Sequence, residues 1–180
     1  MSIKKIAYYH LENSNCGAFL GDTEMEYIDN RRTAISKLTE KDALMTSEEV
    51  HFLVKILWRR KENTYYIIET ANGKTLKATA QQSILTGTGW KRIKNLQVGD
   101  RMMCYDFFQG RRYQKLTSIE KVVGEDIFVY NISLGDRTVV ANGFICSDYD
   151  MQQGDNGGSV QFQYGHGIIR PHTDNTLQRC

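Results

Sequence analysis

Residues 35–42 read Ile-Ser-Lys-Leu-Thr-Glu-Lys-Asp and residues 93–100 read Ile-Lys-Asn-Leu-Gln-Val-Gly-Asp, so the pattern Ile-x-x-Leu-x-x-x-Asp occurs twice, at an offset of 58 residues. Apolar residues three apart suit one turn of helix. The aspartate then marks a turn, and both copies continue into an apolar run that predicts a strand, at 43–45 and 102–104. A unit used twice predicts a domain built from two related halves.

The residues around the repeat predict short strands. Alternation of polar and apolar residues predicts a strand over 23–28, and β-branched and aromatic residues predict strands over 50–58 and 64–70. An Asn-Gly pair at 72–73 predicts a tight turn, after which 74–79 returns antiparallel. No long amphipathic helix pattern occurs in the sequence. The expected fold class is therefore all-β.

The third quarter of the chain has the same alternation of strand and turn patterns. Strands are predicted over 119–123, 127–134, 138–141 and 144–146, and turns are predicted at 124–126 and 142–143. In this interpretation the hairpins 66–79 and 130–142 occupy equivalent places in the two halves. They support the duplication independently of the opening motif.

Composition narrows the class of protein. The chain has 180 residues, 41% of them hydrophobic, and a formal net charge of +2, which suits one domain with a core and flanks. The basic clusters at 59–61 and 111–112 are predicted to be solvated turns, so no nucleic-acid partner is expected. We expect a monomer with a flank at 1–15 and a second, polar flank at 149–180, rich in Gly, Gln, Asn and Asp.

The cysteines show no pairing pattern; they are Cys16, Cys104, Cys146 and Cys180. None forms Cys-x-x-Cys or lies near a histidine at metal-ligand spacing, which argues against a zinc site and a disulfide framework. No apolar run reaches signal-peptide or membrane-span length. A reducing intracellular compartment is the default expectation, with no membrane partner.

Three blocks in a fixed order, 16–42, 79–100 and 129–148, carry a family resemblance. The second block contains Gly-Trp-x-x-Ile-x-x-Leu-x-x-Gly-Asp at 89–100. Together the blocks resemble the Hint superfamily, which comprises inteins, bacterial intein-like domains and hedgehog autoprocessing domains. The resemblance covers residues 16–148 and implies an all-β horseshoe with pseudo-two-fold symmetry.

The resemblance also implies a single-turnover, self-directed reaction that needs no cofactor or metal. The cysteine at the domain start, here Cys16, attacks the carbonyl of the preceding residue, Asn15, and converts the peptide bond into a thioester. Water, a small thiol or another nucleophile then cuts the chain. The substrate would be the chain's own flanking polypeptide, and the thiol must be activated because only the thiolate is nucleophilic.

The second block of the family carries Thr-x-x-His, in which the histidine protonates the departing nitrogen. Thr79 matches the threonine, but Gln82 stands at the histidine position. A glutamine can hydrogen-bond to a peptide but carries no proton at neutral pH. Losing general acid–base help slows a step by about 10²–10⁴-fold.

The third block carries an Asn or Asp after a tyrosine, which Asn131 matches and which would orient the nucleophile. The family ends in His-Asn, whereas this chain has Ser147-Asp148 followed by Tyr149. An ionised aspartate cyclises poorly, and tyrosine is a poor acyl acceptor. We therefore expect cleavage of the N-terminal flank and argue against full splicing.

Other interpretations stay open at this point. Cys16 is also consistent with a buried structural cysteine, Gln82 with a polar lining residue and Thr79 with an ordinary strand residue. The domain as a whole is consistent with a catalytically degenerate Hint domain serving as a structural or interaction module, or with an unrelated small β-barrel binding domain.

Several residues are assigned scaffold roles from the sequence. Asp42 and Asp100 are interpreted as turn residues that bind local backbone N–H groups. Trp90 is interpreted as a core residue and Cys146 as a buried strand residue. The histidines lie outside the blocks; they are His10, His51, His166 and His172.

Overall fold

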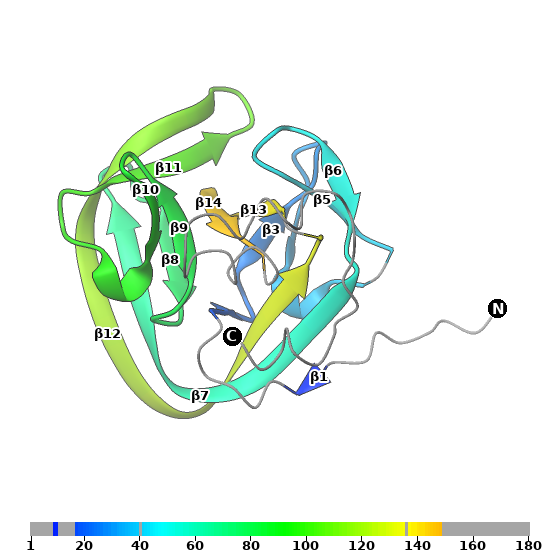
Figure 1. Ribbon diagram of the computed structural model, residues 1–180, viewed down its shortest axis with the longest axis horizontal. Helices are drawn as coiled ribbons and strands as arrows, with labels where there is room; N and C mark the ends of the chain where they lie inside the picture. Colours follow the sequence, from blue (N-terminus) through cyan, green and yellow to red (C-terminus); the bar gives the residue numbers. More distant parts are fainter. Residues whose placement is uncertain (1–8, 11–16, 40, 136, 149–180) are drawn as a thin grey trace.

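The computed structural model describes residues 9–10, 17–39, 41–135 and 137–148 (Figure 1). Asn15 and Cys16, the predicted scissile pair, lie outside the described residues. The predicted flanks do too, apart from residues 9–10.

The described residues form strands and two one-turn 3-10 helices. The strands are β1 (Tyr9–His10), β2 (Phe19–Leu20), β3 (Glu24–Glu26), β4 (Arg32–Ala34), β5 (Ala43–Met45), β6 (His51–Leu53), β7 (Ile56–Thr70), β8 (Thr75–Ala78), β9 (Ser83–Thr86), β10 (Gly89–Arg92), β11 (Arg101–Asp106), β12 (Gly110–Ser133), β13 (Thr138–Ala141) and β14 (Phe144–Ser147). The helical turns are η1 (Ile35–Lys37) and η2 (Ile93–Asn95). All strands but β5 and β6 join one twelve-stranded sheet, which confirms the all-β class.

The two copies of the repeated pattern fold in the same way. In the first, η1 begins at Ile35, the Asp42 N–H donates to the Thr39 carbonyl (3.0 Å) and the Thr39 N–H donates to Asp42 Oδ2 (2.6 Å). This reciprocal pair closes the turn before β5. The prediction of a helical turn, a turn-forming aspartate and a strand is confirmed.

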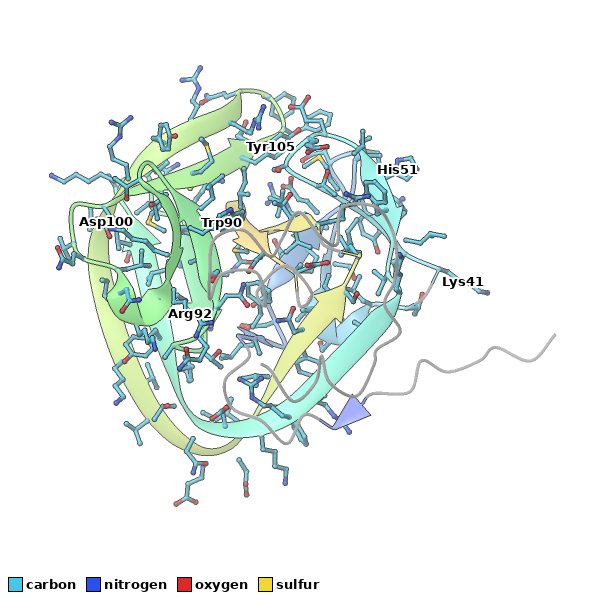
Figure 2. All side chains as sticks on the ribbon, in the orientation of Figure 1. Lys41, His51, Trp90, Arg92, Asp100 and Tyr105 are labelled. Carbon is cyan, nitrogen blue, oxygen red and sulfur yellow. The ribbon has the colours of Figure 1, made fainter. Side chains whose placement is uncertain are left out.

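The second copy repeats those contacts. The Asp100 N–H donates to the Gln97 carbonyl (3.0 Å), and the Gln97 N–H donates to Asp100 Oδ2 (2.9 Å). Lys91 Nζ lies 3.3 Å from both carboxylate oxygens of Asp100, which Figure 2 labels. The isoleucines and leucines of both copies are buried in the main core; they are Ile35, Leu38, Ile93 and Leu96.

A matching hairpin precedes each helical turn. Strands β3 and β4 pair antiparallel before η1, and strands β9 and β10 do so before η2. At the centre, β2 pairs with β8 through Phe19 and Ala78. Strand β8 also pairs with β7 at Tyr66, as predicted for the hairpin 66–79, and β2 pairs with β12 at Tyr130. The strand that opens the first half, β2, thus pairs with β12 of the second half, and the strand that opens the second half, β8, pairs with β7 of the first half.

The predicted hairpin 130–142 is wrong, because its two strands pair with other strands. Strand β13 pairs with β14 and with β3, and the partner of β12 at Tyr130 is β2 from the start of the domain. Local sequence patterns do not indicate a pairing partner more than 100 residues away in the chain. The predicted tight turn at 142–143 is confirmed, because Asn142 and Gly143 have φ of 48° and 84° and join the paired residues Ala141 and Phe144.

Long strands replace several predicted turns. Strands β7 and β12 run antiparallel along the whole of β7 and curve together around the molecule, with β3, β13 and β14 inside the curve (Figure 1). The predicted turn at 124–126 is an irregularity between Val123 and Ile127 at which β12 continues, because β7 supplies ladder partners on both sides. The basic clusters 59–61 and 111–112 lie in these strands, so their prediction as turns is wrong.

The strand predicted over 50–58 is divided into β6 and the start of β7. Between them the Val54 N–H donates to the Asp42 carbonyl (2.9 Å) and the Lys55 N–H donates to the Ser133 carbonyl (2.9 Å). These two bonds satisfy the backbone where the ladder is interrupted. The chain therefore bends without leaving buried donors unpaired.

Candidate functional site

Thr79 holds the beginning of β2. It follows β8 directly, and its N–H donates to the Ala18 carbonyl (2.9 Å) while its Oγ1 accepts from the Ala18 N–H (3.0 Å). Both residues are buried, with exposed fractions of 4% and 1%. Backbone and side chain of Thr79 together satisfy both peptide groups of Ala18, so this segment has one register.

Asn131 holds the residue before Ala18. It lies in β12, fully buried, and its Nδ2 donates to the Gly17 carbonyl (2.5 Å). Its Oδ1 accepts from the N–H of Ile132 (2.7 Å), which fixes the amide orientation. Thr79 and Asn131 come from different blocks of the sequence, and the fold brings both onto the dipeptide that follows Cys16.

Gln82 lies at a second position, beside the end of β14. Its backbone is fixed because its N–H donates to the Thr79 carbonyl (3.1 Å) and its carbonyl accepts from the Ile93 N–H (2.9 Å). The side chain is fully buried. Its Nε2 donates to the carbonyls of Ser83 and Ser147, both at 3.1 Å, and lies 3.5 Å from Ser147 Oγ. Gln82 therefore links the second and third blocks.

Ser147 and Asp148 end the described domain, and both are fully buried. The Asp148 N–H donates to the Arg137 carbonyl (3.0 Å), and Asp148 Oδ2 accepts from the Leu134 N–H (2.8 Å). A buried carboxylate oxygen that accepts from a backbone N–H is a strong, orienting contact. The side chain at position 148 is thus directed at the end of β12.

One contributor has no signature in the sequence. The carbonyl of Ser83 accepts from Gln82 Nε2 and lies 3.5 Å from Ser147 Oγ. Because it is a backbone group, no residue type marks it. The only available signal is its position directly after Gln82.

The described cysteines are poor nucleophiles. Cys104 and Cys146 are buried and carry free thiols. Burial raises the pKa of the Cys104 thiol to about 12, although Lys74 acts in the opposite direction, and burial raises the pKa of Cys146 well above its usual range. The thiolate is the reactive form. The prediction that Cys146 is a buried strand residue is confirmed.

The labelled side chains of Figure 2 place two further predictions. His51 begins β6, is exposed and lies at the edge of the molecule. Trp90 is partly buried against a small cluster of Met45, Tyr105, Val140 and Ile145, which confirms its core role. His166 and His172 lie outside the described residues.

Within the described part of the chain, no three His, Cys, Asp or Glu side chains gather in a way that could hold a metal ion. Among the same residues, no helix has both the length and the apolar character to cross a membrane.

Comparison with solved structures identifies the fold as that of the Hint domains found in inteins and intein-like proteins. No family model matches the sequence, and no curated protein matches it in sequence.

Three solved structures illustrate the likeness. The DnaB intein from Synechocystis sp. PCC 6803 is 23% identical, with a TM-score of 0.63 over 73% of this chain and 98% of that one. The TvoVMA intein is 20% identical, with a TM-score of 0.64 over 74% and 98%. A bacterial intein-like domain from Clostridium thermocellum is 17% identical, with a TM-score of 0.61 over 73% and 97%. At these identities the likeness concerns the fold.

Proposed function

We propose that residues 16–148 form an autoprocessing domain that activates the Asn15–Cys16 peptide bond and releases the N-terminal flank. The observation that carries the proposal is the pair of buried contacts on Gly17 and Ala18. Asn131 binds the Gly17 carbonyl and Thr79 binds both peptide groups of Ala18. Cys16 is covalently joined to a dipeptide with one orientation, as positioning of a nucleophile requires.

The reaction balances without a cofactor. The Cys16 sulfur forms a bond to the Asn15 carbonyl carbon, and the bond from that carbon to the Cys16 nitrogen breaks. The thiol proton passes, in net terms, to the nitrogen, which becomes a free amine. Water or a small thiol then attacks the thioester and displaces the Cys16 thiol. The products are the N-terminal flank, as an acid or a new thioester, and a chain that begins at Cys16.

Gln82 is expected to make this reaction slow. Its amide cannot deliver a proton to the departing nitrogen. Its Nε2 is occupied with the Ser83 and Ser147 carbonyls, which gives it a positioning role. We therefore expect cleavage over hours to days, accelerated by an added thiol.

The C-terminal end supports cleavage without ligation. Asp148 lacks the amide nitrogen through which an asparagine would cyclise, and its carboxylate is bound by the Leu134 N–H. Tyr149 would be a poor acyl acceptor. We propose that the chain after position 148 stays attached.

The test is intact-mass analysis of the 180-residue chain carrying a reporter protein before Met1. A species beginning at Cys16 should accumulate, faster with thiol, and should be absent in Cys16→Ala. The matched control is Cys146→Ala, which removes a buried thiol and should leave cleavage intact. A wild-type chain that stays uncut for days with thiol would refute the proposal.

The second candidate is a catalytically degenerate Hint domain that acts as a structural or interaction module. The burial of Gln82 and its contacts with Ser147 favour it, because they give the position a packing role that needs no chemistry. The same experiment decides between the two, since this candidate predicts a folded, uncut chain.

A further inference from the structure

A short strand from the N-terminal flank is paired with the domain. Strand β1 runs parallel to β7, with Tyr9 opposite Trp58 and His10 opposite Arg59. Figure 1 shows β1 beside β7, at the outside of the curve. The pairing lies upstream of the Asn15–Cys16 bond, in the segment that the proposed cleavage would release.

The edge of β7 that receives β1 is defined by the other strands. A strand has two hydrogen-bonding edges, and β12 follows β7 from Ile56 to Thr70 on one of them. Strand β8 uses the other edge near Tyr66, and β1 uses that edge at Trp58 and Arg59. An extended segment can add to such an edge through main-chain hydrogen bonds alone.

The direction of β1 suits the proposed reaction. Strand β12 is antiparallel to β7 and β2 is antiparallel to β12, so β2 runs in the same sense as β7. Strand β1 is parallel to β7, and therefore β1 and β2 run in one direction on either side of the scissile bond. The chain is held upstream at residues 9–10 and downstream at residues 17–18.

Holding both sides of a scissile bond reduces the freedom of the reacting carbonyl. A bond flanked by two anchors is presented to the nucleophile more often than one with a free upstream arm. The downstream anchor is side-chain based, through Thr79 and Asn131. The upstream anchor is a strand pairing, so it selects an extended conformation more than a particular sequence.

We propose that the β7 edge at Trp58 and Arg59 is a docking site for the substrate of the autoprocessing reaction, the extended upstream flank. This inference rests on the proposed function. The ligand is an extended peptide segment, and its backbone N–H and C=O groups about six residues before the cleaved bond must be available to pair with β7. A flank that is folded or proline-rich at that position would be a poor substrate.

The test compares two double variants of the full chain. Tyr9→Pro with His10→Pro removes the N–H groups of β1 and prevents the pairing. The matched control is Ser2→Pro with Ile3→Pro, which places the same residues outside β1. Both are made with the reporter before Met1 for cleavage and, separately, with Cys16→Ala for hydrogen exchange.

The β1 variant should lose about tenfold in cleavage rate, the size expected for one or two hydrogen bonds. In the uncut Cys16→Ala background it should also exchange those amides of residues 57–60 that face β1 about tenfold faster. Amides of the same stretch that face β12 serve as an internal reference and should not change. The control variant should match the parent in both measurements.

Two results would overturn the inference, and a third would overturn the proposed function on which it rests. Unchanged exchange at 57–60 would mean that the strand pairing does not form in solution. Faster exchange with an unchanged cleavage rate would mean that the pairing does not serve the reaction. Absence of cleavage in the parent would instead remove the proposed function itself, and the exchange data would then describe a purely structural strand.

Discussion

Replacing Gln82 by histidine should raise the cleavage rate while lowering the stability of the fold. The gain is that of a restored general acid at the departing nitrogen, about 10²–10⁴-fold. The loss follows from the contacts. Gln82 Nε2 donates to two buried carbonyls, whereas a neutral imidazole has one N–H to offer. One carbonyl, of Ser83 or of Ser147, is left without this donor, at about 1–3 kcal/mol.

The assay follows intact mass over time for the reporter-linked chain from pH 5.5 to 8.5, together with urea unfolding of the Cys16→Ala background. An ordinary histidine titrates near pH 6.5, so the gain should be largest at the acidic end and fade as the pH rises. The matched control is Gln82→Leu, which fills a similar volume without a donor. It should lose stability and gain no rate.

The histidine and leucine variants together test whether position 82 can act as a proton donor to the departing nitrogen. If histidine and leucine accelerate cleavage equally, the effect is loosening of the site and proton donation plays no part. If the histidine variant folds but cleaves at the wild-type rate, position 82 does not face the departing nitrogen. In either case the role assigned to this position is wrong.

Three further outcomes are expected. Asp42→Ala should lower the free energy of urea unfolding more than Asp100→Ala, by about 1 kcal/mol, because Asp42 accepts from the Tyr27 hydroxyl at 2.6 Å, whereas the further partner of Asp100 is the partly exposed Lys91 at 3.3 Å, an ion pair that contributes little; equal losses would contradict this. Desolvation, together with the Asp42 hydrogen bond, raises the pKa of Tyr27 to about 12, so unfolding free energy should fall between pH 10 and 12, and less steeply in Tyr27→Phe. Cys104 and Cys146 should resist alkylation at neutral pH until urea unfolds the chain, as peptide mapping would report.

The sign of the tyrosine effect follows from where the proton is held. A raised folded-state pKa means that the native chain keeps the Tyr27 proton at a pH where the unfolded chain has lost it. Stability is therefore complete below about pH 10 and is lost as the pH rises towards the folded value. A slope unchanged in Tyr27→Phe would assign the effect to other groups.

The sequence predicted those features that local hydrogen bonds create. Asp42 and Asp100 accept hydrogen bonds from backbone N–H groups three residues away, so a short stretch of sequence is enough to predict their roles. The turn at 142–143 is equally local, because Asn and Gly tolerate the positive φ that it needs. Thr79 and Asn131 were predicted as site residues from the order of the blocks in the family resemblance, and the structure places both in contact with the same dipeptide.

The features that sequence reasoning missed depend on partners distant in the chain. The Gly-Glu-Asp at 124–126 has turn chemistry, yet β12 continues because β7 pairs with it on both sides. The hairpin expected over 130–142 fails because β2 takes the place beside β12. Pairing along a strand of 15 residues outweighs the preference of three.

Within the part of the chain that the structure describes, the two symmetric halves contain equivalent positions with different neighbours. Thr23 occupies the place equivalent to Gln82, because its N–H donates to the Leu20 carbonyl (3.1 Å) and its carbonyl accepts from the Ile35 N–H (2.8 Å). Both residues are buried at the start of a hairpin.

The segments beside the two residues differ. Next to Thr23 the chain turns at Asn142, whose N–H donates to the Glu24 carbonyl (2.8 Å) and whose Oδ1 accepts from the Glu24 N–H (2.7 Å). Next to Gln82 lies Ser147, the last residue of β14. The repeat therefore builds two equivalent places, and the position at which β14 ends makes one of them a candidate for chemistry on the chain itself.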